Sequence, residues 1–160
     1  MHMELIKENK DKHRAVYKLD DGNYKKYWYD KDLYWIYRHV EILNKIMPGY
    51  VLDHGTDLKG AWAVFKQLKG FPANLREHTD EFMLFVYEGC LKNIKETAPY
   101  SHGDWVLSNI YIEGDQLHFC DWDNVGMYAE ELSLDKMHRD LHSAFGDRFY
   151  KVIGYDPAGF

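Results

Sequence analysis

Three polar side chains at the open end of a predicted β-hairpin are the clearest candidates for chemistry. Asp104 and Asn109 precede the first strand of this hairpin, and Asp121 follows the second strand. The open ends of a hairpin lie side by side, so Asn109 and Asp121 can face a common point although 12 positions separate them. Carboxylate and amide oxygens suit a hard cation such as Mg²⁺, which takes one or two carboxylates together with substrate phosphate. The spacing therefore predicts a metal site at Asn109 and Asp121.

The same residues belong to a longer pattern. The triplet His102-Gly103-Asp104 is followed after four residues by Asn109, and the hairpin leads into Asp121-Trp122-Asp123. This pattern resembles the catalytic and metal-binding loops of the protein-kinase-like superfamily, in its aminoglycoside phosphotransferase and choline kinase branch. The order of predicted elements over about residues 3–145 fits the same family. The combined spacing is fairly specific, whereas any one triplet alone would be weak.

The resemblance implies a role for each loop residue. Asp104 would orient or deprotonate an acceptor hydroxyl, Asn109 would hold Mg²⁺, and Asp121 would bridge Mg²⁺ to the phosphates of ATP. His102 would support the loop. Phosphoryl transfer needs mainly positioning and charge neutralisation, so few side chains suffice. The implied activity is ATP- and Mg²⁺-dependent transfer of the terminal phosphate to a hydroxyl acceptor, with a small molecule favoured over a protein.

The resemblance also implies residues that bind the nucleotide in the first part of the chain. Adjacent strand residues point to opposite faces, so Lys25 and Lys26 cannot both face the phosphates, and the family spacing favours Lys26. Glu41, on a predicted helix, would be its ion-pair partner. The connecting segment, including Lys66 and Leu68, would offer backbone groups to adenine in a cleft between two lobes.

The elements that position these residues begin with a predicted antiparallel meander. Segments 3–8, 13–19 and 23–29 have strand-like composition. Asp21-Gly22 joins the last two segments, and Asp-Gly is typical of a type I′ hairpin turn, whose two central residues need positive φ. Residues 32–46 have apolar positions at helical spacing, with Asp30 or Asp32 as the candidate cap.

The second half is predicted to be mainly helical. After the apolar segments 50–52 and 61–68, residues 69–72 break the pattern and mark the boundary between two lobes. Asn74 and Glu77 resemble a capping box, which predicts a helix over 74–96. A hairpin is predicted over 109–120 and a last helix over 133–145, ended by Gly146. The predicted fold is α+β and two-lobed, with domains 1–68 and 69–160.

Composition excludes several classes of protein. Of 160 residues, 46% are hydrophobic and 29% charged, which favours a folded globular chain. Lys and Arg number 10 against 8 Asp and Glu in residues 1–50, and 10 against 18 in residues 51–160. No stretch supplies the basic face that nucleic-acid binding needs. Cys90 and Cys120 suggest neither a disulfide framework nor a zinc site. Without a long apolar run or a signal sequence, we expect a cytoplasmic protein with no membrane partner.

Three features leave alternatives open. The turn over residues 9–12 contains no glycine, and only 39 residues follow Asp121, where relatives have additional helices. Both features favour a pseudokinase that binds a nucleotide or a protein without turnover, and the short second lobe makes a homodimer plausible. His138 and His142 have the i, i+4 spacing of a zinc site, although packing is the commoner role of such histidines.

Each of the other assignments also has a structural alternative. Asp104, Asn109 and Asp121 could cap turns, because Asp and Asn are common there. Lys26 could be a strand lysine facing solvent, and Glu41 could be a surface charge on its helix. The aromatic residues between 24 and 37 are assigned to the core and the interface between the lobes rather than to base stacking.

Overall fold

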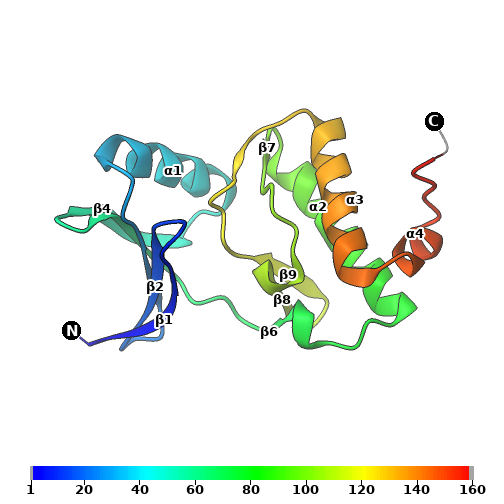
Figure 1. Cartoon of the computed structure of the whole chain (residues 1–160), viewed down its shortest axis with the longest axis horizontal. Coiled ribbons are helices and arrows are strands. Elements are labelled where there is room, and N and C mark those ends of the chain that lie inside the picture. Colours follow the sequence, from blue (N-terminus) through cyan, green and yellow to red (C-terminus); the bar gives the residue numbers. More distant parts are fainter. Residues whose placement is uncertain (1, 159–160) are drawn as a thin grey trace. The chain divides into compact units, whose positions relative to one another are not determined.

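The chain has an α+β fold in a computed structural model that describes residues 2–158. A five-stranded antiparallel sheet and four α-helices are its main elements in that range. Figure 1 traces these elements along the chain. The chain divides into two compact units, Met1–Gln67 and Leu68–Phe160. Among residues 2–158, no helix is both long and apolar enough to cross a membrane.

The first unit is built on the five-stranded sheet, whose order is β1-β2-β3-β5-β4. Its strands are β1 (Met3–Asn9), β2 (Arg14–Leu19), β3 (Tyr24–Trp28), β4 (Val51–Asp57) and β5 (Gly60–Phe65). The predicted opening meander is therefore confirmed. The two apolar segments that follow the helix become a β-hairpin, in which β5 is placed next to β3.

The turn between β2 and β3 is a hairpin turn, but it is not type I′. The amide N–H of Gly22 donates to the carbonyl of Leu19, and the Leu19 N–H donates to the carbonyl of Asn23. Gly22 has a φ of +87°, whereas Asp21 is not among the residues with positive φ. This is a three-residue loop in which a type I turn is followed by a left-handed glycine. The predicted turn type was wrong because Asp20 also belongs to the loop.

Helix α1 (Leu33–Ile46) packs against one face of the sheet. Asp32 caps it by accepting a hydrogen bond of 2.9 Å from the Trp35 N–H, which decides between the two predicted caps. The buried cluster beneath the helix consists of Trp28, Ile36, Val40, Ala61 and Ala63. Small alanines on β5 allow the helix to approach the sheet closely, and Trp28 fills the space between them.

The second unit contains three α-helices and two small sheets. Strands β6 (Phe71–Pro72), β8 (Ile110–Glu113) and β9 (Gln116–Phe119) form one sheet, and β7 (Tyr100–Ser101) pairs with β10 (Gly126–Met127) in the other. The helices are α2 (Asp80–Thr97), α3 (Glu130–Phe145) and α4 (Arg148–Ile153). Short 3₁₀ turns occupy Ala73–Leu75 and Leu107–Asn109. The predicted hairpin over 109–120 is confirmed.

Helix α2 begins six residues later than predicted. Its cap is Thr79, whose hydroxyl accepts a hydrogen bond of 3.1 Å from the Phe82 N–H, and Asp80 and Glu81 occupy its first turn. The Asn74 and Glu77 pattern therefore does not start this helix. Asn74 lies in the 3₁₀ turn Ala73–Leu75.

Helix α3 ends at the predicted residue, because Gly146 takes a φ of +84° and its N–H donates to the carbonyl of His142. It starts three residues before the predicted position. Helices α2 and α3 pack side by side, and α4 packs against both (Figure 1). Met137, Leu141 and Phe149 are fully buried among them.

Candidate functional site

His102 joins the two loops that the sequence singles out. Its side chain is fully buried. Its Nδ1 accepts a hydrogen bond of 3.1 Å from the Asp104 N–H, so the ring proton lies on Nε2, which donates to the Cys120 carbonyl at 2.7 Å. Burial lowers the pKa of His102, and the neutral form is the one that can make both bonds. A single neutral imidazole thus connects the loop after β7 to the loop after β9.

Asn109 holds the carboxylate of Asp104 in place. Its Nδ2 lies 3.2 Å from Oδ2 of Asp104 and 3.3 Å from the Asp104 carbonyl oxygen. Asn109 is itself buried, and its carbonyl accepts a hydrogen bond of 2.9 Å from the Cys120 N–H. Because the amide nitrogen faces Asp104, Oδ1 is the atom of Asn109 that can ligate a cation. Two of the three predicted loop residues are therefore in direct contact.

The loop that carries Asp121 has an unusual backbone. Asp121 has a φ of +57°, a left-handed conformation that is rare outside glycine. The neighbouring Trp122 is buried, and its indole N–H donates to the Phe119 carbonyl at 3.0 Å. Such a conformation persists only where surrounding contacts determine it. The arrangement sets the direction of the Asp121 side chain at the end of β9.

The two loops also approach each other at Gly103. This glycine has a φ of +79°, and a Cβ atom built on it would lie 2.8 Å from the carbonyl oxygen of Asn124. No larger residue fits without backbone movement. Close by, β7 and β10 pair through Ser101 and Gly126. The backbones before Asp104 and after Asp121 are therefore held together over several residues.

Asp140 on α3 is a supporting residue that the sequence did not reveal. Its Oδ2 accepts a hydrogen bond of 2.9 Å from the Trp105 N–H, and its Oδ1 pairs with Lys136 at 2.6 Å. Trp105 follows Asp104 directly and is fully buried. Asp140 therefore fixes the backbone next to Asp104 from a helix 35 residues away. The pair of Lys136 and Asp140 at i, i+4 looks like an ordinary surface pair in the sequence.

The segment that contains these loops carries a strongly negative net charge. Between Lys95 and Lys136 the sequence contains nine Asp and Glu residues and no Lys or Arg. After the dominant effect of burial, the carboxylates of Asp104, Asp121 and Asp123 each act to raise the pKa of His102, which places all three near its ring. Such a field attracts cations, and it repels phosphates unless a cation accompanies them.

The predicted metal ligands fit Mg²⁺ in their chemistry. Asp121 offers a carboxylate and Asn109 an amide oxygen, the kind of donors that Mg²⁺ takes when phosphates and water complete its shell. Within residues 2–158, no group of three or more His, Cys, Asp and Glu side chains is placed to hold a metal ion. Asn109 and Asp121 therefore supply two of the oxygen ligands that such a cation takes.

The two lysines of β3 lie on opposite faces of the sheet, as expected. Lys26 Nζ lies 5.3 Å from the ring centre of Trp28, on the face that α1 covers, whereas Lys25 Nζ lies 4.2 Å from the ring of Trp62. Glu41 is on α1, but its side chain is 67% exposed and it pairs with Lys45 at 3.5 Å. The predicted partner of Lys26 therefore has a partner on its own helix.

The predicted adenine-binding segment already uses part of its backbone. The Lys66 N–H donates to the Tyr50 carbonyl at 2.8 Å, and the Gln67 N–H donates to Oδ1 of Asn23 at 3.1 Å. These bonds tie the segment to the first unit. Leu68 begins the second unit, so Lys66 and Leu68 fall on either side of the division of the chain.

The two histidines of α3 have partners of other kinds. His138 Nε2 lies 3.1 Å from the Tyr87 hydroxyl, and His142 Nε2 lies 2.8 Å from Oδ1 of Asp147. Burial lowers the pKa of His138. Both rings also pack against aromatic side chains, His138 on Tyr87 and His142 on Tyr150. These contacts correspond to the packing role and give no support to a zinc site.

Similarity to known proteins does not identify the chain. No protein-family model and no curated protein matches it. The resemblance in the loops 102–109 and 121–123 thus rests on short motifs and their spacing. Function is therefore inferred from the chemistry of the site.

Proposed function

We propose that the chain is an ATP- and Mg²⁺-dependent phosphotransferase with a protein-kinase-like architecture. It transfers the terminal phosphate of ATP to a hydroxyl group, on a small molecule in preference to a protein. The second unit supplies Asp104, Asn109 and Asp121. The proposal places the activity in the cytoplasm and involves no nucleic acid and no membrane.

One observation carries this proposal: the buried, neutral His102 bonds both to the loop of Asp104 and to the loop of Asp121. Turn capping would explain each carboxylate separately. It does not explain a fully buried histidine whose Nδ1 holds the Asp104 N–H in its own loop and whose Nε2 reaches the Cys120 carbonyl beside Asp121. Preorganisation of this kind is what phosphoryl transfer requires, because the reaction depends mainly on the positions of charges.

The residues divide the chemistry between them. Asp104, held by Asn109 Nδ2, accepts the proton of the acceptor hydroxyl as the new bond from its oxygen to phosphorus forms and the bond to the ADP oxygen breaks. Asn109 Oδ1 and the Asp121 carboxylate would hold Mg²⁺, which would neutralise charge on the phosphates. Asp140 keeps the backbone at Trp105 fixed, and Asp104 keeps its position as a result.

The test is ATP consumption by the full chain, with and without Mg²⁺, in the presence of candidate alcohols. Asp104→Asn and Asp121→Asn should each lower the rate at least about 100-fold. Asp115→Asn is a matched control, because Asp115 is exposed in the turn at the far end of the same hairpin. Turnover that persists in both site variants, or that falls equally in the control, would remove the proposal.

A specific observation favours a second candidate, a pseudokinase that binds nucleotide or protein without turnover. The β1–β2 turn lacks glycine, and two of its backbone donors are already used: the Lys12 N–H donates to Oδ1 of Asn9, and the His13 N–H to the Lys10 carbonyl. These two N–H groups are not available to cradle phosphates. Thermal stabilisation by ATP and Mg²⁺ without turnover for any alcohol would support this candidate.

A further inference from the structure

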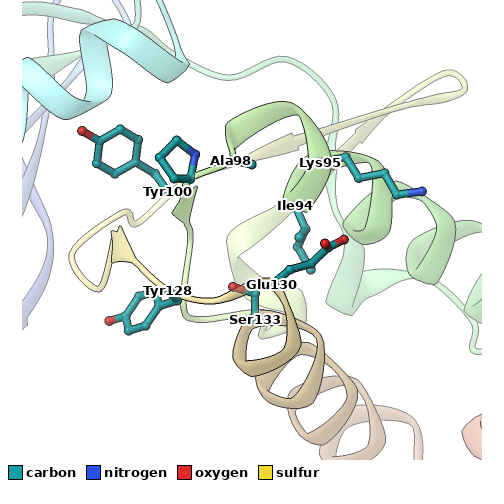
Figure 2. Close-up of a pocket in the computed structure, with 8 residues that line it drawn as sticks. Ile94, Lys95, Ala98, Tyr100, Tyr128, Glu130 and Ser133 are labelled. Atoms are coloured by element: carbon teal, nitrogen blue, oxygen red, sulfur yellow. The ribbon is translucent and has the colours of Figure 1, made fainter.

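The second unit has an open depression of about 380 Å³, lined by the end of α2, β7 and the first turn of α3. Figure 2 shows that polar groups around it do not converge, because the Glu130 carboxylate points away from the Ser133 hydroxyl. Ligand sites usually combine apolar walls with a few convergent polar groups. The edge of the five-stranded sheet in the first unit has a more specific arrangement.

Strand β1 forms one edge of that sheet, with β2 as its only strand neighbour among residues 2–158. The side chains of residues 4–8 are all exposed, and those of Leu5 and Ile6 are 49% and 52% exposed. The backbone groups on the outer side of an edge strand can pair with another strand, and exposed apolar side chains favour this pairing. The outer side of β1 is therefore a candidate interaction surface.

The hydrogen bonds of β2 show which of its residues direct their backbone groups at β1. In an antiparallel sheet, the N–H and C=O of one residue point to the same neighbouring strand, and successive residues alternate between the two neighbours. The Leu19 N–H donates to the Asn23 carbonyl on the side of β3. Lys18 and Val16 therefore direct their backbone groups at β1.

The register then shows which residues of β1 face outward. Glu4 and Lys7 lie opposite these two residues of β2, so their own backbone groups are directed at β2. The neighbouring Met3 and Glu8 direct theirs outward. A β-bulge between Leu5 and Lys7 makes this possible, because without the extra residue two positions three apart would face opposite ways.

A second copy of β1 in antiparallel orientation is complementary to this edge. When Glu4 of one copy lies opposite Lys7 of the other, twofold symmetry places Lys7 of the first copy opposite Glu4 of the second. In the same register Leu5 lies opposite Ile6, and the outward backbone groups of Met3 face those of Glu8.

The charges of the two copies match in this register. Glu4 and Lys7 point to the same face of the sheet, because the residues opposite them on β2 are two positions apart. Two pairs of opposite charge therefore form across the twofold axis, and such pairs stabilise neighbouring strands. The exposed apolar side chains of Leu5 and Ile6 lie between these pairs.

The other edge of the sheet does not have this complementarity. Strand β4 contains Asp53 and Asp57 but no Lys or Arg, so a second copy of β4 would bring further carboxylates to it. Charges of this kind protect an edge against pairing. Because β1 pairs only with β1, the association closes after two copies and does not continue into a filament.

We propose that two copies of the chain associate through β1 and form a continuous sheet of ten strands, five from each copy. Two paired edges bury little surface, so the dimer is weak and depends on the concentration of the chain. The proposal does not depend on the phosphotransferase activity, and either can fail alone.

Sedimentation velocity of the full chain at concentrations up to about 1 mM tests this proposal, because the range covers dissociation constants into the millimolar range. A reversible dimer without larger species is expected. Lys7→Glu places like charges opposite each other in both pairs and should weaken the dimer at least about tenfold. The double variant Glu4→Lys with Lys7→Glu restores both pairs and should recover the original affinity to within about threefold.

The matched control is Lys12→Glu, which makes the same change of charge at an exposed position outside β1 and should leave the affinity unchanged. Hydrogen exchange then locates the interface: the amides of Met3 and Glu8 should exchange more slowly at high than at low chain concentration, whereas those of β4 should not change. A chain that stays monomeric over the whole range, a dimer that Lys12→Glu weakens as much as Lys7→Glu, a double variant that does not recover affinity, or added protection at β4 in place of β1 would overturn the proposal.

Discussion

Two loops of this chain are candidates for handling phosphates, and their backbones are held in different ways. In the β1–β2 turn, the N–H groups of Lys12 and His13 donate to residues three positions away, and the Tyr29 N–H reaches the turn only at its edge, at the His13 carbonyl. The loop over 102–109 has local bonds too, but two of its bonds reach much farther: His102 reaches Cys120 across 18 positions, and Asp140 reaches Trp105 across 35.

This difference indicates where the chain is preorganised. A turn held by its own residues keeps its shape whether or not the rest of the unit is packed. A loop held by distant residues has its shape only in the folded unit, and then with little freedom, because the side chains of His102 and Asn109 are buried and hydrogen-bonded. Preorganised groups act on a transition state without reorganisation. The loop over 102–109 is thus the better candidate for chemistry, and substitutions there should cost more than substitutions in the turn.

The largest effect is expected for His102→Leu. Leucine fills similar space but leaves the Asp104 N–H and the Cys120 carbonyl without partners in a buried place. Each unsatisfied group costs about 1–3 kcal/mol, so the free energy of unfolding of the second unit should fall by about 3 kcal/mol. Chemical denaturation followed by the indole NMR signals of Trp105 and Trp122 reports on this unit.

The control for this substitution is His118→Leu. His118 is on β9, its side chain is 29% exposed, and it pairs with Glu113. Its loss should change the free energy of unfolding by less than about 1 kcal/mol. Equal losses in the two variants would mean that His102 fills space without joining the loops.

The next largest effect is expected for alanine at Gly103, compared with alanine at Gly114, another glycine of the second unit with positive φ. Gly103 has a φ of +79°, and a Cβ atom built on it would lie 2.8 Å from the Asn124 carbonyl oxygen. Gly114 has a φ of +59°, and a Cβ atom built on it would meet open space. Gly114→Ala should cost about 1 kcal/mol through backbone strain alone. Gly103→Ala adds a backbone clash and should cost about 2 kcal/mol more. Denaturant midpoints of both variants measure the difference, and similar midpoints would show that the two loops are not tightly apposed.

A third prediction concerns pH. Burial lowers the pKa of His102 and of His138 below the ordinary value of 6.5, so between these lowered values and 6.5 the folded chain binds fewer protons than the unfolded chain. Protons then favour unfolding: full stability of the second unit is present above about pH 6.5 and declines as pH falls through the lowered pKa values. Each histidine contributes at most about 1.4 kcal/mol per pH unit.

Denaturation at pH 7.5 and at pH 5.0 measures how steeply the free energy of unfolding changes with pH, which is the slope meant below. His138→Phe removes one of the two titrating groups and keeps the ring contact with Tyr87. About half of the slope should therefore persist in this variant, owing to His102. A slope that disappears entirely in His138→Phe would mean that His102 does not titrate against folding.

The sequence predicts the elements of this fold better than their junctions. Alternation and helical spacing depend on residues two to four positions apart, and so the opening strands, the hairpin of Ile110–Phe119 and the cap at Asp32 could be predicted. The start of α2 could not, because Asn74 with Glu77 and Thr79 with its acidic neighbours are both valid local starts. Which of the two forms depends on how the surrounding chain packs.

The residues of the candidate site likewise include some that the sequence predicts and one that it does not. Motif spacing places Asp104, Asn109 and Asp121 near one another, since a hairpin brings its ends together. The supporting Asp140 has no local signal, because a helix carboxylate four residues from a lysine is common on surfaces. Asp140 anchors the loop only because it accepts a hydrogen bond from the Trp105 N–H, 35 residues away in the sequence. No spacing rule predicts this contact.

The smallest effect is expected for a substitution in the β1–β2 turn. Asn9→Ala removes the side-chain acceptor of the Lys12 N–H, a bond of 3.1 Å at an exposed position where water can replace it. The free energy of unfolding should fall by about 0.5 kcal/mol. Asn109→Ala makes the same chemical change at a buried position and should cost about 1–2 kcal/mol, because the Asp104 carboxylate loses its donor. Thermal melts of the two variants measure the contrast. If Asn9→Ala were as costly as Asn109→Ala, the turn would be coupled to the sheet beyond its own bonds, and the two loops would no longer differ in how they are held.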